Sequence, residues 1–461
     1  MHDNLMIEKC LQALRDALGD QVFTDRDVLL EHGKDSAHHV PQAPDVVVEA
    51  ASTNDVQRVV RICSEYGVPI IPFGTGTAVE GGVVAIHGGV CIDVQKMNVI
   101  KRLSVADMDV TVEAGVTRLQ LNEYLAEQGT GLHFPIDPGA DASLGGMAAT
   151  RASGTTAVKY GTMRENVLGL EVVLASGEVI KAGGRARKSS AGYDLTHLFV
   201  GSEGTLGLIT EVTLKLAPLP EAVSAAVCSF VSIDAAVASV IDVMSAGIPV
   251  ARIELLDEIQ MDAVNRYSSL DYEVAPTLFF EFHGSDAAVV AHAERTRTIL
   301  DQHSAKNFTW ASGLGERDRL WEARHNGYYA AIGLREGAVG YVTDVCVPVS
   351  QLAECIRRTK VDLVDCFVPA PLFGHVGDGN FHVVFPIIPG DDAELAEVKA
   401  LGAKMVDHAL SLGGTCTGEH GIGIGKIDAL RHEHGSAVDT MRSIKSALDP
   451  KNVMNPGKVF G

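Results

Sequence analysis

The sequence predicts an α+β protein with two domains and a C-terminal segment that returns to the first of them. Its 461 residues exceed the roughly 150 expected of one domain, so two large or three smaller domains fit the length. Strand-like and helical apolar patterns alternate on both sides of a Pro-Leu-Pro break at residues 218–220. The chain becomes Gly-rich again near its end, as it is at residues 74–89. We therefore expect domains at 1–219 and 220–412, followed by a returning segment at 413–461.

The chain begins with an expected amphipathic helix. Ile7, Cys10, Leu11, Leu14 and Leu18 follow helical spacing among charged residues. A secretory signal needs a basic start and a compact apolar run, which this segment lacks. The eight cysteines are scattered without a CxxC pair, so we expect free thiols. These features predict a cytoplasmic protein, with a peripheral position at the inner membrane as the alternative.

The first domain opens with a strand–helix–strand unit. Residues 46–50 have the pattern of a buried strand, and residues 68–73 are again extended. Between them, residues 55–66 place their apolar side chains on one helical face, and Gly67 is suited to end that helix. Further elements are expected as strands at 90–94 and 109–114, a helix at 117–128, a hairpin within 170–180 and an extended run at 206–216.

The second domain shows a regular alternation of strands and helices. The expected strands are 224–231, 250–255 and 277–283, and the expected helices are 233–245, 257–267 and 286–303. This rhythm favours an antiparallel sheet covered by helices.

Composition excludes several classes of protein. Hydrophobic residues make up 46% and charged residues 21%, as in ordinary globular proteins, which excludes a mainly disordered or fibrous chain. Lys and Arg number 38 against 59 Asp and Glu, a net charge of −21. That charge argues against nucleic acid or an anionic membrane surface as the main partner. No apolar run approaches the ~18–20 residues of a transmembrane segment.

Three loops rich in Gly, Ser and Thr lie between apolar strands of the first domain. They span residues 72–82, 134–162 and 201–207. Glycine lets the backbone approach a ligand closely and turn its N–H groups toward an anion. Each loop alone is also what a surface turn gives, but three together fit a long phosphate-bearing cofactor. The first loop lacks the third glycine of the nicotinamide fingerprint, and a strand-like segment follows it.

These loops resemble the FAD-binding domain of the vanillyl-alcohol oxidase and p-cresol methylhydroxylase superfamily, and most closely its D-lactate dehydrogenase and glycolate oxidase branch. The resemblance runs from about residue 40 to Gly461. It implies a PCMH-type FAD-binding domain, a cap domain and non-covalent FAD, because Thr77 stands where some members attach FAD through His. The residues it implies for cofactor binding are Pro72, Phe73, Gly74, Thr75, Gly76, Thr77, Ala78, Pro138, Gly139, Ser143, Gly146, Ser153, Thr155, Glu203, Gly204, Ile209 and Asn455.

A second constellation combines His and Glu residues near the end of the chain. His375 and His382 flank a Gly-Asp-Gly turn that can bring both imidazoles to one side, and Glu419 and His420 follow later. Imidazole nitrogen and carboxylate oxygen suit Zn²⁺ or Mn²⁺ with positions open for a substrate. A single His is more often a hydrogen-bonded core residue. The family resemblance implies that His375, His382 and Glu419 bind a divalent metal and that His420 acts as a base.

The family resemblance implies oxidation of a small D-2-hydroxy acid, most of all D-lactate, to the 2-oxo acid. The family resemblance implies that Arg324 clamps the substrate carboxylate. Relatives specific for D-2-hydroxyglutarate carry Lys where Val342 stands, so a dicarboxylate is less expected. Electrons would pass to a cytochrome, a quinone or an electron-transfer flavoprotein rather than to NAD.

Alternatives remain open at this point. Within the class they are a glycolate oxidase subunit and a dehydrogenase of other D-2-hydroxy acids. Outside it they are an FAD-dependent transferase and a non-catalytic flavin subunit. The sequence does not fix the oligomeric state, and a homodimer is one assembly compatible with it.

Overall fold

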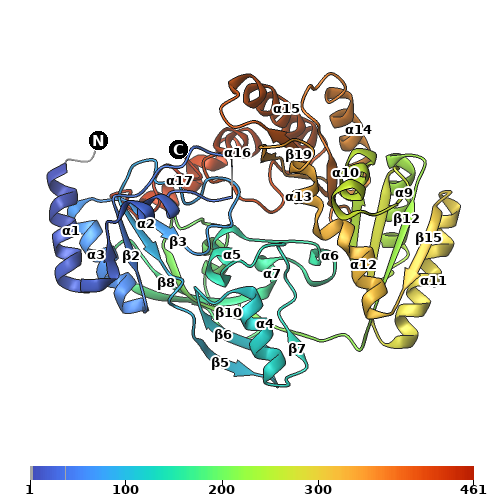
Figure 1. The fold of residues 1–461 in the computed structure, drawn as a ribbon. Coiled ribbons are helices and arrows are strands. Elements are labelled where there is room, and N and C mark those ends of the chain that lie inside the picture. The colour runs from blue at the N-terminus through green and yellow to red at the C-terminus, as the bar shows by residue number, and fades with distance from the viewer. Residues whose placement is uncertain (1–3, 37) are drawn as a thin grey trace. The chain divides into compact units, whose positions relative to one another are not determined.

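The computed structural model describes residues 4–36 and 38–461 and divides into two compact units. The first unit comprises residues up to Ser153, Gly161–Leu219 and Glu419–Gly461, and the second comprises Gly154–Tyr160 and Pro220–Gly418. The mixed helix-and-sheet architecture predicted from the sequence is confirmed (Figure 1). Among the helices of the described residues, none combines the length and apolarity that crossing a bilayer requires.

One sheet of the first unit is built around the predicted strand–helix–strand unit. Its order is β1-β2-β4-β3, with β4 parallel to both β2 and β3. Its strands are β1 (Val22–Phe23), β2 (Val46–Glu49), β3 (Ile70–Phe73) and β4 (Val90–Asp93), and its helices are α1 (Asn4–Leu18), α2 (Arg26–Glu31) and α3 (Thr53–Tyr66), with η1 (Gly19–Gln21) after α1. Helix α1 lies along α3 (Figure 1), where Cys10 and Leu14 join the buried cluster formed with Val56, Val59 and Cys63. Helix α3 ends at Gly67, whose φ of 68° is the left-handed stop that the sequence predicted.

The other sheets of the first unit are antiparallel. The larger has the order β5-β6-β10-β8-β9, and β7 pairs with β11. Their strands are β5 (Ile100–Ser104), β6 (Asp109–Glu113), β7 (Leu132–His133), β8 (Val167–Val173), β9 (Val179–Gly183), β10 (Leu208–Lys215) and β11 (Ala217–Pro218). The hairpin predicted around residues 176–177 is the β8–β9 pair, whereas the sequence reasoning missed β5. The remaining helices are α4 (Arg118–Glu127), α5 (Leu144–Thr150), α7 (Met163–Asn166), α8 (Leu195–Phe199), α16 (Ile427–His434) and α17 (Ala437–Leu448).

The second unit is one antiparallel sheet with helices on both faces. Its strand order is β15-β12-β14-β13-β18-β19-β16, and β17 also pairs with β19. The strands are β12 (Ala222–Ser229), β13 (Val250–Leu256), β14 (Thr277–Gly284), β15 (Lys306–Ala311), β16 (Val339–Val342), β17 (Val345–Cys346), β18 (Leu372–His375) and β19 (Asn380–Ile387). The helices are α6 (Ala157–Tyr160), α9 (Ile233–Ser245), α10 (Glu258–Ser268), α11 (Asp286–Gln302), α12 (Leu314–His325), α13 (Gly327–Ile332), α14 (Leu352–Asp362) and α15 (Asp392–Ser411), with η2 (Val349–Gln351) before α14. The predicted antiparallel sheet and its first three strands are confirmed.

Alternation along the strands separates two faces of this sheet. Phe280 and Phe282 on β14 join the cluster that packs under α9, α11, α14 and α15. Phe279, which precedes Phe280 on the same strand and points to the other face, joins the opposite cluster with Trp321 of α12 and residues of α10 and α13. Polar residues of β13, β18 and β19 also lie on this second face. Each stands two positions along its strand from a member of the second cluster, and side chains two positions apart point to the same face. The sheet therefore gathers charged groups beneath α12.

A buried ion pair fastens the end of the returning segment. The ammonium of Lys445 donates to the Asp449 carboxylate and, at 2.8 Å each, to the carbonyl oxygens of Thr205 and Met454. Asp449 also accepts from the backbone N–H groups of Val453 and Met454. Burial lowers the pKa of Lys445, and Asp449 opposes that shift.

Replacing Asp449 with Ala should destabilise the protein by about 3–5 kcal/mol, because it leaves a buried ammonium without its counter-ion. Urea unfolding monitored by circular dichroism measures this loss. Asp439→Ala, in the first turn of α17, is the matched control, since the Asp439–Arg431 pair is exposed and should contribute little. Equal shifts in the two variants would contradict this assignment.

Candidate functional site

A cavity in the first unit collects most of the residues predicted to bind a cofactor. It opens at the ends of β3, β6 and β10 and beside α5, and residues of the returning segment complete its wall. The predicted residues that line it are Pro72, Phe73, Gly74, Thr75, Gly76, Thr77, Ala78, Pro138, Ser143, Gly146, Ser153, Glu203, Gly204, Ile209 and Asn455. Gly139 and Thr155 are described but do not line it, and Thr155 belongs to the second unit.

Glycine shapes the cavity where a side chain would not fit. Gly204 has a φ of +72°, and a Cβ there would lie 2.6 Å from Pro72 Cγ. A Cβ on Gly74 would lie 2.3 Å from the hydroxyl of Ser143. Ser143 in turn caps α5 by accepting a hydrogen bond from the Gly146 N–H. At these positions the wall is therefore backbone and small side chains, which lets a ligand approach the backbone closely.

Glu203 secures the returning segment against this wall. Its carboxylate oxygens accept hydrogen bonds from the N–H groups of Ile422 at 2.7 Å and Gly423 at 2.8 Å. The side-chain amide of Asn455 donates to the backbone carbonyl of Glu203 at 2.8 Å. Burial raises the pKa of Glu203 above its ordinary value, and the two backbone N–H groups oppose that shift. The carboxylate of Glu203 is thus committed to contacts within the chain.

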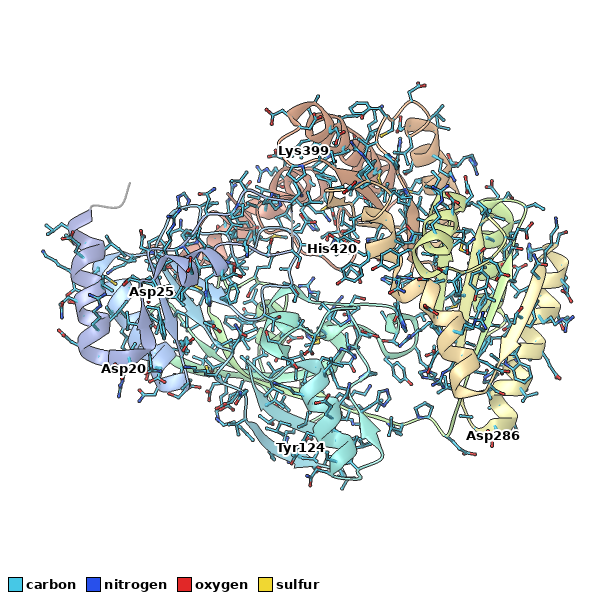
Figure 2. The ribbon with its side chains drawn as sticks, in the orientation of Figure 1. Asp20, Asp25, Tyr124, Asp286, Lys399 and His420 are labelled. Atoms are coloured by element: carbon cyan, nitrogen blue, oxygen red, sulfur yellow. The ribbon has the colours of Figure 1, made fainter. Side chains whose placement is uncertain are left out.

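Sequence reasoning missed Glu80, which also lines the cavity. One of its oxygens lies 3.1 Å from the Lys426 ammonium and 3.8 Å from His420 Nδ1. His420 (labelled in Figure 2) lines the same cavity, and its Nε2 lies 3.8 Å from the Glu419 carboxylate. A lone Glu in a Gly-rich loop carries no sequence signal for a partner 340 or more positions away.

The predicted histidine pair lies on a hairpin of the second unit. His375 ends β18, His382 lies on β19, and their ring centroids are 5.6 Å apart. His375 Nδ1 is 2.7 Å from Glu254 Oε1, and His382 Nδ1 donates to the Thr343 carbonyl at 3.0 Å. With Nδ1 so engaged in each ring, Nε2 is the nitrogen that would bind a metal.

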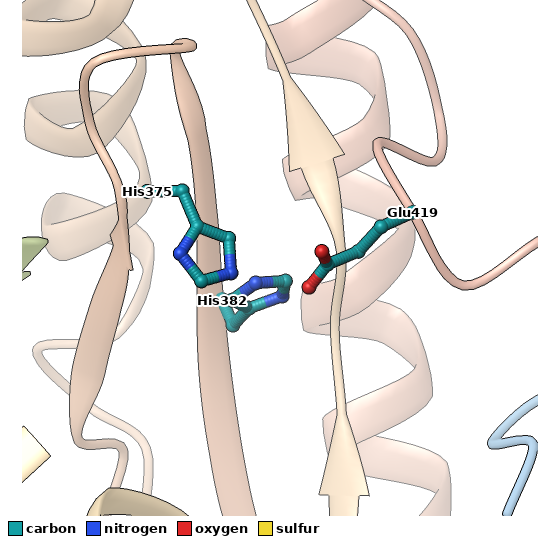
Figure 3. Close-up of side chains that lie close together, drawn as sticks. All are labelled: His375, His382 and Glu419. Carbon is teal, nitrogen blue, oxygen red and sulfur yellow. The ribbon is translucent and has the colours of Figure 1, made fainter. Parts of the chain in front are cut away.

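Glu419 joins the two histidines (Figure 3). One ligand atom from each of His375, His382 and Glu419 lies within 4.8 Å of the others. The residue before Glu419 is fixed locally, because the Gly418 N–H donates to Asp344 Oδ2 at 2.8 Å. Asn380 donates to the other Asp344 oxygen at 2.7 Å, which ties the Gly-Asp-Gly turn to the same carboxylate. Two imidazoles and one carboxylate form a donor set suited to Zn²⁺ or Mn²⁺.

Arg324 lies on α12 above the same sheet face. Its Nε donates to Glu254 Oε2 at 2.6 Å, and its guanidinium lies over the Phe373 ring, 4.9 Å from the centroid. Burial alone would raise the pKa of Glu254, but His375 and Arg324 together hold it below its ordinary value. The structure thus brings Arg324 and His375 to one shared carboxylate.

Family comparisons cover nearly the whole chain. The family described as "FAD linked oxidases, C-terminal domain" matches residues 219–459, and the "FAD binding domain" family matches residues 44–183. Among solved structures, a 4-ethylphenol oxidase from Gulosibacter chungangensis superposes with a TM-score of 0.83 at 20% identity, covering 99% of this chain and 98% of the other. A p-cresol methylhydroxylase gives 0.82 at 21% identity, with coverage of 99% and 97%. These two likenesses confirm the predicted PCMH-type fold.

Curated relatives are much closer in sequence. A probable mitochondrial D-lactate dehydrogenase of Danio rerio is 50% identical over 98% of this chain and 92% of its own length. A mitochondrial D-lactate dehydrogenase (cytochrome) of Arabidopsis thaliana is 45% identical over 98% of this chain and 80% of its own. The glycolate oxidase subunit GlcD of Bacillus subtilis is 34% identical over 96% and 94%.

The cytoplasmic location predicted from the sequence is wrong. The relatives from Danio and Arabidopsis, and those from Saccharomyces cerevisiae and Kluyveromyces lactis, are all named as mitochondrial proteins. They point to mitochondria rather than cytoplasm. The prediction rested on the pattern of the first residues and on the scattered cysteines. The amphipathic pattern reports the packing of α1 on α3 and not a compartment.

The family resemblance predicted from the loops and the His/Glu constellation is confirmed by these comparisons. One family match spans more than half of the chain, and relatives at 34–50% identity span nearly all of it. The chain therefore belongs to the FAD-linked oxidases, in the branch that contains the D-lactate dehydrogenases and the glycolate oxidase subunit.

Proposed function

We propose that this protein oxidises D-lactate to pyruvate with FAD and passes the electrons to a cytochrome rather than to NAD. The observation that carries the proposal is the grouping of His375, His382 and Glu419, with Nδ1 of each imidazole engaged by the protein. Supporting it, relatives at 45% and 38% identity are named D-lactate dehydrogenase (cytochrome). A quinone or an electron-transfer flavoprotein is the alternative acceptor.

The cavity of the first unit is proposed to hold FAD without a covalent bond. Its Gly-rich wall fits a dinucleotide, since small residues let backbone N–H groups approach the phosphates. Thr77 offers no group that commonly attaches to flavin. We propose domain boundaries after residues 219 and 412, with residues 1–219 and the returning segment 413–461 serving the cofactor. The chemistry that FAD would supply there is a hydride acceptor for the oxidation at C2 of the substrate.

The metal proposed at His375, His382 and Glu419 is Zn²⁺ or Mn²⁺. A divalent ion held by these three residues would supply Lewis acidity that lowers the pKa of a substrate hydroxyl. The protein supplies the donor set and the partners that orient it.

His420 and Arg324 complete the proposed set of residues. His420 takes the hydroxyl proton while the C2 hydrogen leaves as hydride, so that two electrons and two protons leave the substrate. Arg324 binds the substrate carboxylate. Because its Nε donates to Glu254, the edge formed by Nη1 and Nη2 is the one that would meet that carboxylate. Val342 offers no charge for a second carboxylate, which favours a monocarboxylic substrate.

Glycolate oxidation is the second candidate. The relative of 34% identity named as a glycolate oxidase subunit favours it, and the same residues would carry the same chemistry on a substrate without the methyl group.

Gly204→Ala should reduce retention of FAD about tenfold or more, because the new methyl group would strike Pro72 in the cavity wall. The ratio of absorbance at 450 nm to that at 280 nm after gel filtration measures retention. Gly129→Ala is the matched control: its φ of +59° imposes a similar backbone strain, but no atom lies within 4 Å of the added carbon. Equal loss in both variants would indicate a general folding defect.

Anaerobic addition of D-lactate should bleach the flavin absorbance of the purified protein rapidly, and L-lactate should not. Glycolate and D-2-hydroxyglutarate are added in parallel, each with Zn²⁺ or Mn²⁺ present. Bleaching by glycolate alone would favour the second candidate. A flavin that none of the four acids reduces would overturn the proposed function.

His420→Ala should retain FAD but slow flavin reduction by about 10²–10⁴-fold, the usual contribution of a general base. Stopped-flow absorbance at 450 nm measures the rate. His434→Ala, on the exposed surface of α16, controls for removal of an imidazole from the same part of the chain. Reduction at the wild-type rate in His420→Ala would remove this residue from the base role.

A further inference from the structure

Glu254 lies on the charged face of the second unit's sheet, the face that α12 covers. It stands on β13 directly opposite His375 of β18 in the strand register. The carboxylate has no exposed surface. Its Oε1 contacts His375 Nδ1 at 2.7 Å, and its Oε2 contacts Arg324 Nε at 2.6 Å. Each oxygen therefore serves a different partner.

The contact to His375 fixes the tautomer of its imidazole ring. A carboxylate oxygen only accepts, so Nδ1 carries the hydrogen and Nε2 keeps the lone pair that a metal needs. Nε2 then lies on the side of the ring that approaches His382 and Glu419 (Figure 3).

The contact to Arg324 fixes the orientation of its guanidinium. The Nε bond and the stacking over Phe373 hold the guanidinium plane from two directions. A fixed plane loses less conformational entropy when it binds a carboxylate at its remaining edge.

We propose that Glu254 is a positioning residue that aligns two parts of the hydroxy-acid site at once, the metal ligand His375 and the carboxylate-binding Arg324. This inference rests on the proposed function. It assigns to Glu254 no contact with substrate or cofactor, and it predicts that one substitution impairs metal affinity and substrate binding together.

A glutamine at this position cannot serve both partners. The amide has one accepting oxygen and one donating NH₂ group. If the oxygen faces Arg324, the NH₂ group faces His375 Nδ1 and forces the hydrogen onto Nε2, where it blocks the metal. If the oxygen faces His375, two donors meet at Arg324 and the guanidinium moves. Either arrangement damages one half of the site.

The neighbouring strand supplies a matched control. Glu281 of β14 is also buried, lies opposite Arg252 of β13, and contacts His283 Nε2 at 2.7 Å. It repeats the same combination of Glu, His and Arg in the same sheet. Among the described residues, however, His283 belongs to no cluster of side chains that could hold a metal ion. Glu281→Gln therefore reproduces the loss of a buried charge without touching His375.

The experiment measures Zn²⁺ affinity by isothermal titration on chelator-treated, FAD-loaded protein. Glu254→Gln should bind Zn²⁺ 10–100-fold more weakly than wild type, and Glu281→Gln should bind it as wild type does. KM for D-lactate, with Zn²⁺ saturating, should rise in Glu254→Gln as well. Glu254→Asp keeps both accepting oxygens on a shorter arm and should show a smaller loss, which covers the case in which the Gln variant does not fold.

The outcomes separate this inference from the proposed function. Wild-type protein that binds no Zn²⁺ would overturn the proposed metal site and this inference with it. Tight binding in wild type and in both Glu254 variants would overturn the inference alone. Equal weakening in Glu254→Gln and Glu281→Gln would also overturn it, because it would show a general effect of removing a buried charge.

Discussion

A single carboxylate without exposed surface, that of Glu254, organises the charged face of the second unit. Placing such a group inside a sheet is costly unless cations and hydrogen-bond donors surround it. His375 comes from the neighbouring strand and Arg324 from the covering helix, and together they meet that requirement. The same contacts that make the buried charge tolerable also restrict the imidazole and the guanidinium to one orientation each. The same contacts therefore both stabilise the buried carboxylate and orient the two side chains that it binds.

The first unit uses the same principle to attach its C-terminal segment. Glu203 accepts hydrogen bonds from two backbone N–H groups near residue 422, and the buried pair of Lys445 and Asp449 fastens the segment further along. Asn455 then reaches the backbone of Glu203 and Gly82. Because these anchors are polar and buried, each is costly to leave unpaired, and together they hold the segment in one register. That register is what brings His420 and Asn455 to the cavity wall.

The comparisons separate fold from chemistry. The 4-ethylphenol oxidase and the p-cresol methylhydroxylase share the architecture at 20–21% identity, whereas the relative named as a probable D-lactate dehydrogenase is 50% identical. A common fold hosts different reactions because the reaction depends on a few side chains placed on it. In this chain three of the side chains in the proposed site lie on one sheet face, where β13, β18 and β19 carry Glu254, His375 and His382. A shift of one residue in any of these strands would turn its polar side chain to the opposite, apolar face.

Local pattern determined the elements of this protein and the loops between them. The helix ending at Gly67, the hairpin at residues 176–177 and the turn that presents His375 and His382 all depend on residues close in sequence, and all could be predicted. Contacts between side chains that are far apart in the sequence could not be predicted in this way. Glu254 lies 121 positions from His375 and 70 from Arg324, and no spacing rule joins them. Glu80 forms its ion pair with Lys426 only when the returning segment packs on the loop that carries Glu80. Strand order, register and chain return decide such pairs, because they are set by the burial of whole faces and not by any local run of residues.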